Sequence, residues 1–394
     1  MFAVLPTPRK LLRHLCLLLG ALVLAACGDV SLNTGGGGGQ PIQPDAPVPV
    51  ALLAPLGASG AQEAALARDL EAAARLAVAD LEGVRIDLRV YDTFGQAAGA
   101  QQAALDAVSD GARIIVGPLH AQSANVAAVA VANKGVNVLA FSNNPTVAGG
   151  NLFVLGQTFD DTARRLMDYA VRNGKRRVVT VHSSNVAGEL GRDAIAKAAS
   201  DAGASVVANV PYQFSQEGVV AAVPRVTSAV RSANADALFM TANTAGALPL
   251  FTQMLPENGL APGDIQYIGL SRWDEPPQTL ELPGVQGGWF AMPDQGKSRT
   301  FETRFQAANG RYPHALAGLA YDGIAAVGAL AKSGRRDALS RASLTQSAGF
   351  QGTGGVFRLR KDGTSQRGLA VATIRDNRVV ILDPAPKGFG GAGF

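Results

Sequence analysis

Several short polar loops in this sequence directly follow apolar runs, and they hold the side chains best suited to binding a small molecule. Hydroxyl and amide groups in such loops can satisfy a carboxylate, especially where the N-terminus of a helix lies behind them. An ammonium group needs an acceptor, preferably an anionic one, and Glu189 and Asp274 are the anionic candidates near these loops. The alternative role of each polar residue is to cap a helix or a turn. The candidate ligand-binding residues are Ser123, Asn125, Ser142, Asn143, Asn185, Asn243 and Trp273.

The sequence lacks the residue patterns of catalytic and metal sites. Beyond the N-terminal segment it has three histidines, His120, His182 and His314, which are far apart and without the spacing of metal ligands. The motifs G-x-S-x-G, S-x-x-K, H-E-x-x-H and G-x-x-x-x-G-K-[ST] are missing. We therefore expect a protein that is not an enzyme and that needs neither a cofactor nor a metal.

The stretch 112–145 shows how the chain must position these loops. Residues 114–116 form a continuous apolar run that predicts a buried parallel strand, and the Ala- and Val-rich segment 121–133 predicts a helix. Gly135 ends that helix, and 136–141 predicts the next strand. In open parallel sheets ligands bind outside the carboxyl ends of the strands, so these loops are expected on the rim of a cleft.

The same alternation of strands and helices runs along most of the chain and predicts an α/β fold with two lobes. Each lobe is expected to be a doubly wound, mostly parallel sheet, and a late segment must return to the first lobe because two lobes that share a cleft need crossovers. The chain then predicts an antiparallel meander between 356 and 382. The expected boundaries are 49–157 with 285–334 for the first lobe, 158–284 with 335–384 for the second lobe, and 385–394 for a flexible tail.

The first 26 residues have the features of a signal peptide. Three basic residues, Arg9, Lys10 and Arg13, precede the apolar run 15–26, which is too short to span a bilayer. The run ends in L-A-A-C, which resembles the bacterial lipoprotein box, so Cys27 is expected to become the lipidated first residue of the mature chain. Residues 27–48 are rich in glycine and proline and predict a tether between that lipid and the folded body.

Charge and cysteine content argue against a nucleic-acid-binding protein and against a fold stabilised by disulfides. Removal of the signal peptide lowers the formal net charge from +4 to +1, so nothing favours a nucleic-acid partner. Cys16 leaves with the signal peptide, so the mature chain keeps one cysteine and no disulfide can form within it. The hydrophobic fraction of 47% is ample for buried cores.

Two motifs and the repeated lobes resemble a known family. The motifs I-I-V-G-P-L at 114–119 and V-N-V-L-A-F-S at 136–142, with two lobes and a return crossover, are similar to the type I periplasmic binding proteins. The likeness extends over 50–382 and is greatest to the leucine/isoleucine/valine-binding branch. It implies a Venus flytrap that closes over a small ligand by a hinge motion and feeds a transporter or a sensor.

The residues of that family's amino-acid site match only in part. Ser142 and Asn143 correspond to the family's carboxylate-binding loop. Ala121 stands where the family offers a serine, and Ala187 and Ala245 stand where it offers aromatic side chains. The resemblance therefore implies that the contacts that hold leucine are reduced here.

The C-terminal segment resembles a second group, the penicillin-binding protein activator lipoproteins. The likeness lies in G-G-V-F-R-L-R-K-D-G-T-S-Q-R-G-L-A-V at 354–371 and V-V-I-L-D-P-A-P at 379–386. It implies a regulator of peptidoglycan synthesis whose partner is a penicillin-binding protein. The alternative is a solute-binding lipoprotein that delivers a small polar ligand, such as an amino acid, to an ABC permease. In both cases the chain would face the periplasm, and Gly28 after Cys27 favours the outer membrane.

Overall fold

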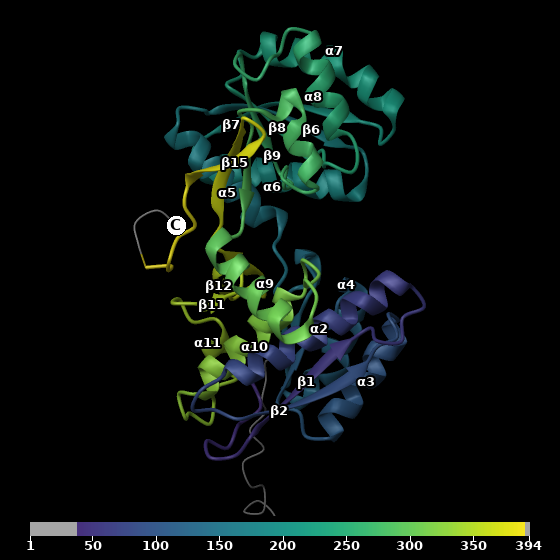
Figure 1. Cartoon of the computed structure of the whole chain (residues 1–394), viewed down its shortest axis with the longest axis vertical. Coiled ribbons are helices and arrows are strands. Elements are labelled where there is room, and N and C mark those ends of the chain that lie inside the picture. The colour runs from purple at the N-terminus through teal and green to yellow at the C-terminus, as the bar shows by residue number, and fades with distance from the viewer. Residues whose placement is uncertain (1–37, 391–394) are drawn as a thin grey trace, which may run out of the picture. The chain divides into compact units, whose positions relative to one another are not determined.

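The computed structural model describes residues 38–390, which form an α/β fold with two lobes (Figure 1). The signal peptide, Cys27 and the tether up to residue 37 lie outside the described residues. A parallel sheet lies in the first lobe, a mixed sheet in the second, and a small antiparallel sheet near the end of the chain. Within residues 38–390, no helix combines the length and apolar character needed to cross a membrane.

Sheet A, the sheet of the first lobe, has five strands in the order β2-β1-β3-β4-β5, and all neighbours are parallel. Its strands are β1 (Val48–Ala54), β2 (Ile86–Asp92), β3 (Ile114–Val116), β4 (Asn137–Ala140) and β5 (Leu152–Val154). The helices between them are α2 (Ala61–Asp80), α3 (Ala97–Ser109) and α4 (Ala121–Val131). Because both faces of the sheet are covered, the central strand β3 is buried along its whole length and is apolar without alternation.

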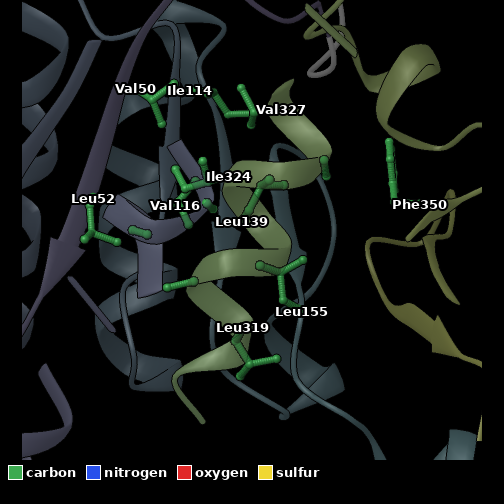
Figure 2. Packing of buried hydrophobic residues seen from close by; sticks show 14 of the residues in the cluster. Val50, Leu52, Ile114, Val116, Leu139, Leu155, Leu319, Ile324, Val327 and Phe350 are labelled. Atoms are coloured by element: carbon green, nitrogen blue, oxygen red, sulfur yellow. The ribbon is translucent and has the colours of Figure 1, made fainter. Parts of the chain in front are cut away.

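Helices from distant parts of the sequence cover one face of sheet A. Helix α2 and helix α10 (Gly318–Ala331) share a core with this face, while α3 and α4 cover the other face. Figure 2 shows Ile324 and Val327 of α10 directed at Ile114 and Val116 of β3. Close packing here uses small residues, because a Cβ on Gly323 would lie 2.8 Å from a methyl group of Val116.

Glycine is required where β3 turns into α4. Gly117 has a φ of +93°, and a Cβ at this position would lie 2.2 Å from the carbonyl oxygen of Leu53. A side chain would therefore suffer both backbone strain and a clash. The turn brings the N-terminal end of α4, with His120 and Ala121, to the carboxyl edge of the sheet.

Sheet B, the sheet of the second lobe, has seven strands in the order β15-β14-β10-β9-β8-β6-β7. Its strands are β6 (Arg177–Ser183), β7 (Ser205–Tyr212), β8 (Ala237–Met240), β9 (Gln266–Gly269), β10 (Trp289–Met292), β14 (Ala370–Arg375) and β15 (Arg378–Asp383). Helices α5 (Phe159–Arg172) and α6 (Val186–Asp201) pack on one face, and α7 (Gln216–Ser232) and α8 (Leu248–Glu257) pack on the other. The order β7-β6-β8-β9-β10 repeats the order of sheet A, so the two lobes are built on one plan.

Three crossovers join the lobes, and two of them differ from the expected boundaries. Strand β10 belongs to sheet B, so the chain returns to the first lobe at 293–294 and not at 285. It then forms α9 (Gln295–Asn309), α10, α11 (Arg341–Leu344) and sheet C, which consists of β11 (Phe350–Gly352), β12 (Gly355–Leu359) and β13 (Ser365–Arg367). Phe350 and Phe357 of sheet C pack into the core of the first lobe. The last crossover therefore lies at 368–369 and not at 335.

Candidate functional site

A cleft of about 1360 Å³ is lined by residues of both lobes. The first lobe contributes the N-terminal parts of α2 and α4, the loop after β4, and one face of α9. The second lobe contributes the loop after β9 and the end of β10, and the crossover residues Gly156, Gln157, Pro293 and Leu369 line the cleft as well. The cleft thus lies at the carboxyl ends of parallel strands, where the fold is expected to bind its ligand.

Two of the predicted ligand-binding residues line this cleft. Ser142 is 6% exposed, and its Oγ accepts a hydrogen bond of 3.1 Å from the backbone N–H of Asn144. Asn143 beside it is exposed. The hydroxyl hydrogen of Ser142 and the amide of Asn143 therefore remain available for a ligand, close to the N-terminal end of α4.

The other polar candidates do not line the cleft. Ser123 is buried in α4, and Asn125 lies exposed on the same helix. Asn185 caps α6, since its Oδ1 accepts hydrogen bonds from Gly188 N at 2.8 Å and from Ser183 Oγ at 2.9 Å. Asn243 lies exposed in the loop after β8. For Asn185 the structure therefore shows the capping role that was the alternative.

Trp273 lies in the core of the second lobe, not on the rim where the sequence analysis placed it. Its side chain is 0% exposed and packs on the backbones of Gly269 and Gly288. A Cβ on either glycine would lie 2.1 Å from the indole ring, so these two residues create the space for it. The neighbours of Trp273 in sequence, Arg272 and Asp274, line the cleft instead.

Arg272 is a charged cleft residue that the sequence analysis did not select. Its guanidinium group donates to both carboxylate oxygens of Asp274, at 3.0 and 2.5 Å, and lies 2.7 Å from Glu275 Oε1. Asp274, a predicted ammonium acceptor, is thus already paired with a cation. Glu189, the other predicted acceptor, pairs with Arg192 and does not line the cleft.

Acidic residues outnumber arginines along the cleft. Its ionisable residues apart from histidine are Glu63, Asp69, Asp274, Glu275, Glu302, Asp322, Arg272, Arg299 and Arg367. Within residues 38–390, all of these form ion pairs except Arg299 and Glu302 of α9. Nowhere in that range do three or more His, Cys, Asp or Glu side chains gather as a metal site would require.

Arg367 connects the cleft to the crossovers. Its side chain donates to the carbonyl oxygen of Leu155 at 2.7 and 3.0 Å and pairs with Asp322 of α10 at 2.9 Å. Its backbone N–H donates to Asp161 of α5 at 3.2 Å. Burial raises the pKa of Asp161 to about 7, against the opposing charges of Arg164 and Arg367. Arg367, the last residue of β13, thus contacts the chain just after β5 and a helix of each lobe.

Comparison with known proteins defines the class to which this fold and cleft belong. The family model described as periplasmic binding protein matches residues 47–378, and the chain therefore belongs to that family. Members of this family bind solutes in the periplasm. The chain is therefore of the solute-binding class and works in the cell envelope. Among curated proteins, none matches this sequence significantly.

Solved structures with a similar fold come from several bacteria. A putative branched-chain amino acid ABC transporter protein from Rhodospirillum rubrum has a TM-score of 0.72 and 18% identity, over 86% of this chain and 100% of that chain. An ABC transporter substrate-binding protein from Desulfitobacterium hafniense, in complex with Leu, has a TM-score of 0.61 and 17% identity, over 86% and 100%. A solute-binding protein from R. palustris, in complex with benzoate, has a TM-score of 0.56 and 19% identity, over 88% and 99%. At these identities the likeness establishes the fold.

Proposed function

We propose that this chain is the solute-binding component of an ABC transporter and holds a small polar ligand in the cleft between its lobes. The observation that carries the proposal is the cleft itself, which draws its lining from both lobes and from the crossovers between them. A ligand that touches both lobes favours their closure, because it binds the closed form more tightly. The solved structures of similar fold support the same role, since they include substrate-binding proteins with Leu and with benzoate.

Regulation of peptidoglycan synthesis, the role implied by the C-terminal motif, has less support. Residues 354–371 form β12, β13, the last crossover and the start of β14. Val356, Phe357 and Leu359 are buried there, and Phe357 and Leu359 belong to the core of the first lobe. The folding requirements of this segment account for its apolar residues and its Asp362-Gly363 turn, so the motif needs no partner protein to explain it.

A thermal-shift screen tests the transport proposal. A solute that binds the folded protein raises its melting temperature, by an amount that grows with ligand concentration relative to the dissociation constant. The panel should contain leucine, isoleucine, valine, benzoate and other small polar solutes. We expect at least one solute to give a saturable shift. The proposal fails if no solute does so while the protein stimulates a peptidoglycan synthase.

Branched-chain amino acids are expected to bind weakly. Ala121 lines the cleft with a methyl group, and Ala187 and Ala245 do not line it at all. Asp274 is already engaged by Arg272, so a ligand ammonium group would compete for it. Desolvating both charges of a small zwitterion without full compensation costs several kcal/mol. We predict that leucine, isoleucine and valine bind with dissociation constants no better than about 1 mM, which corresponds to a binding free energy near −4 kcal/mol. Calorimetry measures these constants. A micromolar constant for any of the three would contradict this.

We also propose that Cys27 anchors the protein through lipid to the outer membrane, with Gly28 as the residue that follows the lipidated cysteine. Cys27→Ala should then give a soluble periplasmic form or an unprocessed precursor, which membrane fractionation and mass spectrometry distinguish. A mature-length Cys27→Ala protein that still sediments with membranes would contradict the proposal. The inner or outer location follows from density-gradient separation of the wild-type protein.

A further inference from the structure

Helix α9 presents a row of polar side chains to the cleft. Gln295, Ser298, Arg299 and Glu302 all line it, and their spacing places them on one helical face. The helix is fixed to the first lobe by Phe305, which is 0% exposed in that lobe's core. The charges of Arg299 and Glu302 therefore move with the first lobe.

These two charges have no ion-pair partner among the described residues. Arg299 makes one hydrogen bond, of 3.3 Å, from its Nε to the carbonyl oxygen of Gln295 in its own helix. Both side chains belong to exposed residues. By contrast, the other carboxylates and arginines of the cleft are paired, as described above.

The second lobe presents the complementary charges in the loop after β9. Arg272 is held by Asp274, whose side chain is 10% exposed, while Glu275 is 54% exposed and reaches toward solvent. Burial alone would lower the pKa of Arg272, but the hydrogen bonds and charge of Asp274, and the charges of Glu275 and Glu302, raise it. Glu302 and Arg272, which carry opposite charges, thus line the same cleft from opposite lobes.

We propose that α9 and the loop after β9 form an ionic latch across the cleft, in which closure of the lobes pairs Glu302 with Arg272 and Arg299 with Glu275. The latch concerns the regulation of the cleft and rests on the proposed solute-binding function. It makes closure depend on ionic strength, because exposed ion pairs are screened by salt. It is tested without any ligand, so failure to identify a solute leaves the test intact.

Distances between the lobes provide the readout. The segment 38–394 contains both large sheets and every core described above, and it has no cysteine, since Cys16 and Cys27 precede it. Spin labels on A98C in α3 and Q216C in α7 lie in the first turns of equivalent helices, at exposed positions in the two lobes. Double electron–electron resonance then reports the ratio of the shorter to the longer distance population.

Charge reversal separates the latch from a general salt effect. R299E and E275R should each lower the short-distance population about two- to five-fold at 20 mM NaCl, and the double variant R299E/E275R should restore it. At 500 mM NaCl all variants should coincide. The control is K197D/D201K, which reverses an exposed ion pair within α6 of one lobe and should change nothing.

The proposal is overturned if the single reversals leave the distance distribution unchanged, or if the double reversal fails to restore it. Melting temperatures measured on the same samples show that every variant is folded. Because Arg299 and Glu275 are exposed residues, we expect these temperatures to remain close to that of the parent segment.

Discussion

Replacing Arg367 by methionine should lower the free energy of unfolding by about 3–5 kcal/mol, the usual cost of removing one partner of a buried ion pair. The side chain of Arg367 is 11% exposed and that of Asp322 is 1% exposed. After Arg367→Met the Asp322 carboxylate would keep its hydrogen bond from the backbone N–H of Thr353 at 2.7 Å but lose its cation. The carbonyl oxygen of Leu155 would lose both of its arginine donors.

Arg335 provides the matched control. It forms an ion pair of 2.7 Å with Asp337, with side chains 64% and 60% exposed. Arg335→Met removes the same chemical group at the surface, where solvent screens the pair, and should leave the free energy of unfolding close to that of the parent protein. Denaturant titration measures both variants. Equal effects of the two substitutions would contradict the structural role of Arg367.

A double variant identifies the cause of the loss. Arg367→Met with Asp322→Asn removes the unpaired negative charge, so it should be less destabilised than the sum of the two single variants. If the double variant shows simple additivity, the loss comes from packing and not from an uncompensated carboxylate.

Trp273→Ala should destabilise the protein by about 3–5 kcal/mol, as expected for removal of a buried tryptophan from a packed core. The indole is 0% exposed and belongs to the core that includes Phe290 and Tyr267. Gly269 and Gly288, which make room for the ring, cannot fill the space after its removal. Denaturant titration measures the loss, and a change below about 1 kcal/mol would contradict burial of this residue.

Fluorescence gives an independent test, because the chain has two tryptophans. In Trp289→Phe the emission comes from Trp273 alone, and we expect it to be blue-shifted and protected from acrylamide. In Trp273→Phe the emission comes from Trp289, which is partly buried. Its ring packs edge-on against that of Tyr169, with 4.9 Å between the ring centroids. That emission should be more accessible to the quencher. The reverse order would place Trp273 on the surface.

The layers of each lobe, and the edge of sheet A at which the cleft lies, follow from patterns in the sequence. The apolar run 114–116 predicted a buried parallel strand, and alanine-rich segments predicted helices that cover the sheet. The structure has β3 at 114–116, with α2 and α4 among the helices that cover the sheet. Such patterns are local, since each strand or helix must bury its apolar positions at its own period. Ser142 and Asn143 were found in the same way, because their place after β4 puts them at the carboxyl edge of the sheet.

The packing of elements that are distant in sequence sets which residues face the cleft from the second lobe and from α9. In the sequence R-W-D at 272–274, tryptophan was the candidate for the rim, but the space beside Gly269 and Gly288 places it in the core and leaves Arg272 and Asp274 at the cleft. Likewise, Glu302 and Arg367 reach the cleft because the chain crosses between the lobes at 293–294 and 368–369. Periodicity cannot reveal these positions, because it reports how one element is buried and carries no information on which distant element covers it.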